Sequence, residues 1–400
     1  MSGDYYYESV HCVDKNMKSE LGKASEAREL SKWEFLDMVQ DRKVTGEEFT
    51  CVVCSPTKAQ VGSPFTHWGH SKCPASADFV YAGVSAIKFS SIFCLPLTAV
   101  VEATVTGNLG YNLIRAAGLY LNDIPKASLS CAVCLTRKSR SVLMIPDKCP
   151  KNWTPEYTGI LCSGLFDERI CVAQPAEELP NIPVTSNIRK NYIHITLLYN
   201  PLDNGAVNFR YNRGEIPSCS VCSAQPESVV FTRWGKTSCP KGSVTKYSGF
   251  VLGHEGYICK REDSYKESDL MIHKSSFYDI YGILYKVSDS GFKSEEFKRL
   301  NNKLIPCVLC ETPHSATFTQ FGSSTCPGET KAAYKGFTFA LTHKAFCFDE
   351  NPEPYQEKHY HPYSFPRAAS VRTSCNTDAL PCEPFVGKRS VPCAQCISTN

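Results

Sequence analysis

The stretch "FTRWGKTSCPKGSVTKYSGF", residues 231–250, contains a Trp-Gly, a Cys-Pro and a Tyr-x-Gly and shows no helical periodicity. The Cys-Pro and the Tyr-x-Gly return together at three other places, and the tyrosine always lies eight positions after the cysteine. Recurrence at a fixed spacing is the signature of a repeat architecture. The four pairs are Cys73/Tyr81, Cys149/Tyr157, Cys239/Tyr247 and Cys326/Tyr334.

Other cysteines keep a constant order around this segment. A C-x-x-C pair precedes each Cys-Pro, a single cysteine follows each Tyr-x-Gly, and a fifth pair closes the chain. The pairs are Cys51/Cys54, Cys131/Cys134, Cys219/Cys222, Cys307/Cys310 and Cys393/Cys396. The single cysteines are Cys94, Cys171, Cys259 and Cys347, and Cys375 and Cys382 precede the last pair.

We therefore predict four repeats that follow an incomplete one. Repeats one and three carry a Trp-Gly before the Cys-Pro, whereas repeat two has "MIPDKCP" and repeat four has "FGSSTCP", so the higher-order unit is predicted to be a pair of repeats. The expected segments are the C-terminal part of a truncated repeat at 1–50, repeat 1 at 51–130, repeat 2 at 131–218, repeat 3 at 219–306, and repeat 4 with a terminal Cys-rich segment at 307–400.

The local pattern is typical of a mainly β protein with short helical or irregular connections. β-branched and aromatic residues in repeat three predict strands at 228–234, 245–253, 255–261 and 278–287. Helical spacing predicts a short helix in 293–302. Apolar residues at three-residue steps predict a core-facing amphipathic helix in 25–40; they are Leu30, Trp33, Leu36 and Val39.

The 22 cysteines in 400 residues indicate disulfides in an oxidising compartment or metal sites in a reducing one. C-x-x-C is half of a zinc site, but the second half here is never another C-x-x-C, so the spacing favours disulfides. Five copies of the motif suit architecture better than a redox active site. Since four cysteines allow three connectivities, a first hypothesis joins the Cys-Pro cysteine to the downstream single one, as Cys239–Cys259.

The N-terminus carries a different signal. The opening residues have neither a basic region nor an apolar region, so they do not form a signal peptide. The stretch "YESVHCVDKN", residues 7–16, resembles the end of a repeat, with Cys12 in the place of the single cysteine. We therefore expect a truncated chain whose signal peptide lies upstream and whose Cys12 lacks its usual partner. The alternative is a chain that begins here and stays in the cytoplasm.

Candidate ligand contacts are Trp68, Arg233 and Trp234, because an exposed tryptophan beside a cation suits stacking on a glycan. The alternative is that each tryptophan anchors the core against the Cys-Pro turn, which Phe321 at the same place in repeat four favours. The cations flanking the Trp-Gly are expected to occupy a solvated strand edge; they are His67 and His70 in repeat one and Arg233 and Lys236 in repeat three.

Catalytic patterns do not stand out. The ten histidines do not recur at matched positions, and no G-x-S-x-G, H-E-x-x-H or paired-carboxylate pattern is present. No catalytic residue, metal site or cofactor is predicted. The net charge of +3 is made of mixed charges, which argues against nucleic acid or an anionic membrane as partner. Asn152 begins a glycosylation sequon, weakened by Pro155.

The combination "TRWGKTSCP…YSGF…GYIC…IPCVLC", with "SVLMIPDKCPKNWTPEYTGIL" and "LPCEPFVGKRSVPCAQC", resembles the non-collagenous cysteine repeats of sponge-type short-chain collagens and related uncharacterised proteins of aquatic animals. The resemblance covers nearly the whole chain and implies an extracellular, disulfide-bonded, β-rich module with structural or adhesive roles. The chain has no Gly-X-Y run, so it cannot itself form a collagen triple helix.

The sequence thus predicts a non-enzymatic extracellular protein that interacts with matrix components or glycans. One alternative is a lectin-like glycan-recognition or defence protein, which would need an exposed aromatic and polar cluster in several repeats. Another is an intracellular zinc-binding repeat protein. No stretch is long and apolar enough to predict a membrane span.

Overall fold

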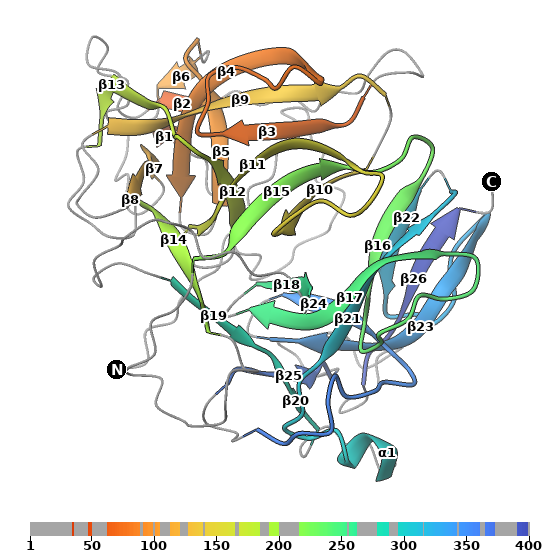
Figure 1. Cartoon of the computed structure of the whole chain (residues 1–400). Coiled ribbons are helices and arrows are strands. Elements are labelled where there is room, and N and C mark those ends of the chain that lie inside the picture. Colours follow the sequence, from red (N-terminus) through yellow and green to blue (C-terminus); the bar gives the residue numbers. More distant parts are fainter. Residues whose placement is uncertain are drawn as a thin grey trace, which may run out of the picture. The chain divides into compact units, whose positions relative to one another are not determined.

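The structure is a computed structural model that describes the greater part of the chain (Figure 1). Three short strands are described by their backbone alone; they are β1 (Glu34–Phe35), β2 (Glu47–Phe49) and β6 (Val101–Thr104). The other described residues are 62–88, 91–98, 113–120, 127–138, 141–164, 168–184, 192–199, 216–253, 256–261, 278–287, 295–314, 316–341, 344–360, 365–372 and 390–398.

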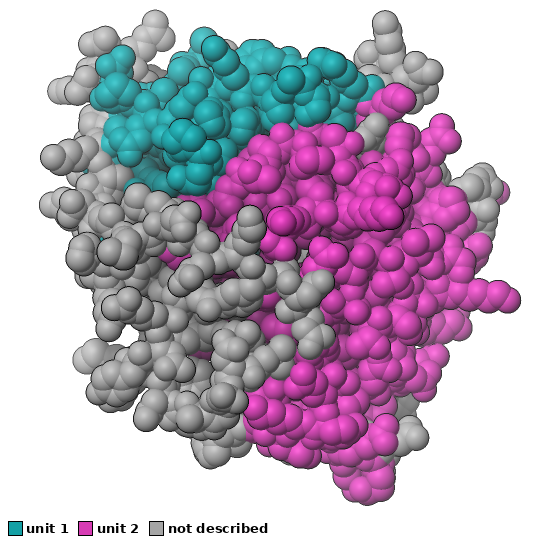
Figure 2. Space-filling view, viewed as in Figure 1, with its two compact units in different colours: residues 1–137, 162–195, 272–276 teal, residues 138–161, 196–271, 277–400 magenta. Residues whose placement is uncertain are grey.

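Contacts divide the chain into two compact units, coloured separately in Figure 2. Strands dominate the described part of both, so the predicted mainly β class is confirmed. Unit 1 contains Met1–Arg137, Cys162–Ile195 and Ile272–Ser276. Unit 2 contains Lys138–Leu161, Thr196–Met271 and Phe277–Asn400.

One antiparallel pattern recurs along the chain, and we call each copy a module. Its sheet order is the first strand before the Cys-Pro, the C-x-x-C strand, the Tyr-x-Gly strand and the single-Cys strand. The C-x-x-C strand comes last in sequence but is inserted between the first two. In module C (229–312) these strands are β16 (Val229–Trp234), β21 (Pro306–Thr312), β17 (Val244–Gly253) and β18 (Tyr257–Arg261).

The other modules repeat this order. Module D (317–398) has β22 (Thr317–Phe321), β26 (Pro392–Ser398), β23 (Thr330–Ala340) and β24 (Ala345–Asp349). Module A (64–136) has β3 (Pro64–Trp68), β9 (Ala127–Thr136), β4 (Ala77–Lys88) and β5 (Ser91–Pro96). In module B (142–223), β10 (Val142–Pro146), β15 (Ser218–Ser223) and β11 (Thr154–Ser163) follow the same order.

The remaining elements extend these sheets or connect them. In unit 1, β7 (Leu113–Ala116) pairs with β4, β13 (Glu178–Pro183) pairs with β9, and β8 (Gly118–Tyr120) pairs with the start of β14 (Tyr192–Tyr199). In unit 2, β19 (Tyr278–Gly282) pairs with β17 and with the end of β14, and β20 (Leu284–Lys286) pairs with β25 (Arg367–Ser370). Strand β12 (Arg169–Ala173) and helix α1 (Glu295–Lys298) complete the set.

All four Tyr-x-Gly tyrosines occupy one register position, as the fixed spacing predicts. Each follows a β-bulge and pairs with the residue two positions after the first cysteine of the next C-x-x-C. A bulge adds one residue and re-aims the side chain that follows it. Three of the hydroxyls donate to the carbonyl of the single cysteine, at 2.9–3.0 Å; the pairs are Tyr81/Cys94, Tyr247/Cys259 and Tyr334/Cys347.

The glycine two positions after the tyrosine is required by close approach of the backbone. A Cβ atom at Gly336 would lie 1.6 Å from the carbonyl oxygen of Phe348, and one at Gly249 would lie 1.7 Å from that of Lys260. Both oxygens belong to the single-Cys strand. The absent side chain therefore lets this strand pair with the Tyr-x-Gly strand.

The structure corrects three local predictions. A strand, β1, replaces helix within 25–40, because pairing with β2 and β7 overrides the local apolar spacing; the four stripe residues lie outside the described residues. The strand predicted at 278–287 is two strands, β19 and β20, interrupted at Ile283. The C-x-x-C motif, expected to precede a strand, is itself a strand buried on both faces. The short helix predicted in 293–302 is confirmed as α1.

Replacement of Gly336 by Ala tests the close approach. We expect Gly336→Ala to reduce the free energy of unfolding by about 3 kcal/mol, because the new methyl group overlaps the Phe348 carbonyl. Gly322→Ala is the matched control: Gly322 has a φ of +82°, but a Cβ there would meet nothing within 4 Å, so only about 1–2 kcal/mol of backbone strain is expected. Equal losses in denaturant unfolding would contradict this explanation.

Candidate functional site

The C-x-x-C strand is cross-linked on both of its faces. Side chains three positions apart on a strand point to opposite sides of the sheet. In module C, Cys307 lies in the same core cluster as Cys259 and Leu309. Cys310 lies in a different cluster, together with Val308 and with Cys239 packed against it. Each cysteine of the motif therefore fixes a different layer to the central strand.

The same connectivity is present in every module where it is described. The Cys-Pro cysteine bonds to the second cysteine of the next C-x-x-C, and the single cysteine bonds to the first. The first kind of disulfide comprises Cys73–Cys134, Cys149–Cys222, Cys239–Cys310 and Cys326–Cys396. The second kind comprises Cys94–Cys131, Cys259–Cys307 and Cys347–Cys393. Cys171 and Cys219 are disulfide-bonded as well.

The hypothesis of a Cys239–Cys259 bond was wrong, because Cys239 and Cys259 lie on opposite faces of the sheet. Each C-x-x-C that the structure describes is bonded to residues before it, whereas the expected segments at 131, 219 and 307 start with that motif. A disulfide-closed module therefore ends on its C-x-x-C.

These bonds bear on the other chemistries considered for the cysteines. Zinc needs thiolate ligands, and the sulfur of a disulfide does not supply one. A C-x-x-C redox site closes a bond within the motif, whereas here the two cysteines bond to different partners. Within the described ranges no group of three or more metal-binding side chains is present. Cys162 is free and buried, and burial raises the pKa of its thiol far above the usual range.

The junction between modules C and D is built around the Trp-Gly turn. Strand β24 of module D runs parallel to β16 and pairs with it at Trp234 and Phe348. The Trp234 ring packs against Tyr257 and Phe346, with centroids 5.3 and 5.5 Å apart. Gly235 has a φ of +86°, and a Cβ atom there would lie 2.6 Å from the Phe348 ring. Glycine is therefore required for both conformation and space.

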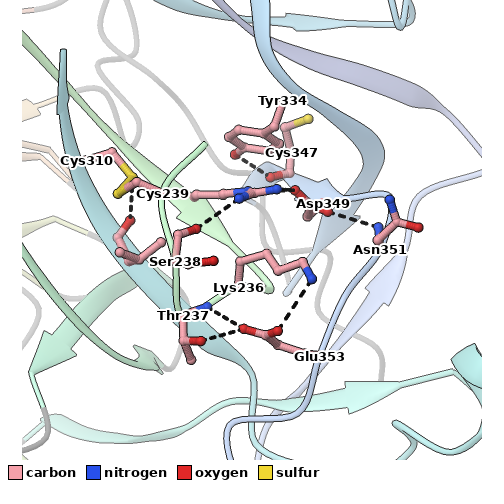
Figure 3. Close-up of polar contacts among 12 residues, drawn as sticks. Lys236, Thr237, Ser238, Cys239, Cys310, Tyr334, Cys347, Asp349, Asn351 and Glu353 are labelled. Carbon is pink, nitrogen blue, oxygen red and sulfur yellow. Dashed lines mark hydrogen bonds and ion pairs between the residues drawn. A yellow bond between two sulfur atoms is a disulfide. The ribbon is translucent and has the colours of Figure 1, made fainter. Parts of the chain in front are cut away.

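A nearly buried ion pair crosses this junction (Figure 3). Nε and Nη2 of Arg233 both lie 2.7 Å from Oδ2 of Asp349, whose side chain is 2 % exposed. Arg233 also donates to the Ser238 carbonyl and lies over the Tyr334 ring. The backbone amide of Asn351 donates to the second carboxylate oxygen. Both charges are therefore satisfied, as a buried pair requires.

A second carboxylate of module D binds the residues of the Trp-Gly turn directly (Figure 3). The amide and hydroxyl of Thr237 both donate to Oε1 of Glu353 at 2.6 Å, and Lys236 lies 3.4 Å from Oε2. The Glu353 amide donates to the Gly235 carbonyl. Burial alone would raise the pKa of Glu353, but the Thr237 hydrogen bonds and the Lys236 charge outweigh it and lower the pKa below the usual range.

The first Trp-Gly turn is held in the same way within unit 1. Strand β12 pairs in parallel with β3 at Val172 and Trp68. The amide and hydroxyl of Ser71 donate to one oxygen of Glu177, and His70 contacts the other, all at 2.9 Å. The Ser71 amide hydrogen bond holds the pKa of Glu177 at about 2. The stabilisation that the charged Glu177 gives to this turn is therefore complete above the ordinary pKa of Glu. It is lost as the pH falls from there towards 2.

The predicted ligand contacts lie within these junctions. Trp68 is 8 % exposed, Trp234 is partly buried among aromatic rings, and Arg233 is engaged by Asp349. The cations expected on a solvated edge are instead bound: His70 by Glu177 and Lys236 by Glu353, while buried His67 contacts the Lys72 carbonyl. This placement matches the core-anchor interpretation of the tryptophans.

Other candidates are placed outside these junctions or not at all. Asn152 is exposed in a turn with a φ of +70°, so its glycosylation stays a prediction. Cys12, Cys51, Cys54, Cys375 and Cys382 lie outside the described residues.

Sequence reasoning missed the two glutamates. Glu177 and Glu353 each lie six positions after the single cysteine, in repeats two and four only. The matching positions of repeats one and three are Val100 and Tyr265. A search for features shared by alternate repeats would have found them.

No known protein-family model matches the chain. In the described part of the chain, no helix has the length and apolar character needed to cross a membrane.

The ion pair at the C–D junction yields a direct test. We expect Asp349→Ala to lower the free energy of unfolding by about 3–5 kcal/mol, because it leaves the Arg233 charge buried without its partner. Asp78→Ala is the matched control: Asp78 pairs with Arg137 where both side chains are more than 60 % exposed, so the loss should stay below about 1 kcal/mol. Similar losses for the two variants in denaturant unfolding would contradict the assigned role.

Proposed function

We propose that this protein is a secreted, non-enzymatic interaction protein that associates with extracellular matrix. The observation that carries the proposal is that sixteen of the described cysteines are disulfide-bonded. Each described C-x-x-C strand contributes two of them. Disulfides of this density form and persist in oxidising compartments and are rare in the cytosol. The resemblance to the cysteine repeats of short-chain collagens supports the same compartment and a structural or adhesive role.

The chemistry of the junctions favours a structural role over ligand recognition. The polar and aromatic side chains that could bind a glycan are Trp68, Trp234 and Arg233, and neighbouring strands of the same chain already contact them. A lectin-like protein would need such side chains free on the surface in several repeats. Modules cross-linked by disulfides are suited to hold a fixed surface in the oxidising environment outside the cell.

Expression in two compartments tests the proposal. Residues 1–400 would be produced with a heterologous signal peptide and, in the same host, without one. We expect the secreted protein to be soluble and its sixteen bonded cysteines to resist alkylation under denaturing conditions without reductant, as intact mass would show. We expect the cytosolic protein to aggregate, because each disulfide contributes about 2–4 kcal/mol to a small module.

Retention on a decellularised matrix gives the second readout. Secreted protein that remains bound after a salt wash supports matrix association, with the reduced and alkylated protein as control. Soluble cytosolic protein with reactive thiols and stoichiometric zinc would overturn the proposal. Binding to a glycan array without retention on matrix would favour the lectin-like alternative.

A further inference from the structure

Modules B, C and D stack in series, and both of their stacking interfaces use the same two faces. The face that carries the Cys-Pro disulfide packs on the face of the next module that carries the single-Cys disulfide. Between modules C and D, one core cluster joins Phe231 and Cys310 to Tyr334, Cys347 and Cys393. Between modules B and C, another joins Ile145 and Cys222 to Tyr247, Cys259 and Cys307. We call the face with the Cys-Pro disulfide the acceptor face and the face with the single-Cys disulfide the donor face.

The acceptor face of module D is open. Phe318 corresponds to Phe231 by its distance from the Cys-Pro cysteine, yet it is 38 % exposed where Phe231 is 5 % exposed. Phe321 corresponds to Trp234 and is 43 % exposed. Among the described residues, β22 pairs only with β26, whereas β16 pairs with β21 on one side and with β24 on the other. An uncovered strand edge is a template for another strand.

The donor face of module A is open as well. Tyr81 is half-buried, whereas its three counterparts are at most 9 % exposed; they are Tyr157, Tyr247 and Tyr334. Tyr334 is covered because Phe231 of the preceding module packs on it, with ring centroids 6.3 Å apart. Val80 is 47 % exposed, whereas Ala333, in the same position of module D, packs into the C–D cluster.

The two open faces match in chemistry. The acceptor faces of modules A and C carry a cation beside the Trp-Gly, His70 and Lys236 respectively. Their partners are Glu177 of module B and Glu353 of module D. Module D has Ser323 where module C has Lys236, and Gln320 where it has Arg233. The donor side of module A has Pro96 in the place of Asp349. At Gln320 and Ser323 of module D and at Pro96 of module A, the charges of the C–D junction are therefore replaced by uncharged residues.

We propose that the acceptor face of module D binds the donor face of module A in a second copy of this chain. The contact continues the stacking seen between modules C and D, with Phe318 and Phe321 against Val80 and Tyr81. Because the two surfaces differ, the association is head-to-tail and can propagate beyond a dimer. Such an assembly extends the matrix role proposed above. It depends on the exposed faces of modules A and D and not on secretion.

Complementation between two variants tests this pairing on the oxidised chain of residues 1–400. Phe318→Asp disables the acceptor face and Val80→Asp disables the donor face, and both positions are exposed, so the fold should persist. Sedimentation velocity of the unchanged protein should show a mass that rises with concentration past the dimer. Each variant alone should sediment as a monomer. Their equimolar mixture should give about a twofold rise in mass and no more, because one intact face of each kind remains.

Val244→Asp is the matched control, because Val244 is 60 % exposed but lies in neither face, and this variant should associate as the unchanged protein does. A monomer at every concentration, a mixture that stays monomeric, or equal loss of association in the control would overturn the pairing. Intact mass without reductant confirms that the disulfides of each variant have formed, and a failed association leaves the secretion result unaffected.

Discussion

The structure depends on one geometric constraint, which is that two cysteines three positions apart on a strand face opposite sides of a sheet. Because each bonds to a different partner, the central strand holds the Cys-Pro turn on one face and the single-Cys strand on the other. The closed loops have sequence separations between 37 and 73 residues. In the chain-entropy model each such bond contributes about 4 kcal/mol. Two bonds per module offset the small core that four short strands can bury.

Disulfides fix each module, while polar contacts select how modules meet. A nearly buried pair such as Arg233 and Asp349 adds little net stability compared with apolar side chains of similar volume, because both charges lose water. A shift of β24 against β16 would leave both charges buried without a partner, which costs free energy, so the pair favours a single register. Glu353 acts in the same direction, since its hydrogen bonds to Thr237 form only when the turn and the following loop are aligned.

Much of the fold could be predicted from spacing, but the bonding could not. The fixed distance between Cys239 and Tyr247 predicted the repeat and the common position of the tyrosines, and the β-branched and aromatic residues predicted the strands. The pairing of Cys239 was missed because it depends on which face of the sheet each cysteine occupies, and that requires the C-x-x-C to be recognised as a strand. The sequence pattern does not indicate a strand here, because this strand is buried on both faces and lacks alternating polar and apolar residues. The N-terminal helix was wrong for a related reason, since strand pairing from outside 25–40 decided its conformation.

The junction was harder to predict than the module. Glu177 and Glu353 carry no motif of their own, and their role follows only once a parallel strand brings the next loop to the turn. The tryptophans were visible, but whether they face solvent depends on the neighbouring module.

Disulfide mapping of the oxidised protein tests the central claim most directly. Proteolysis without reductant, followed by mass spectrometry, would identify the linked peptides of module C. The account predicts peptides that join Cys239 to Cys310 and Cys259 to Cys307. A peptide that joins Cys239 to Cys259, or a bond within the Cys307/Cys310 pair, would contradict a central strand held from both faces.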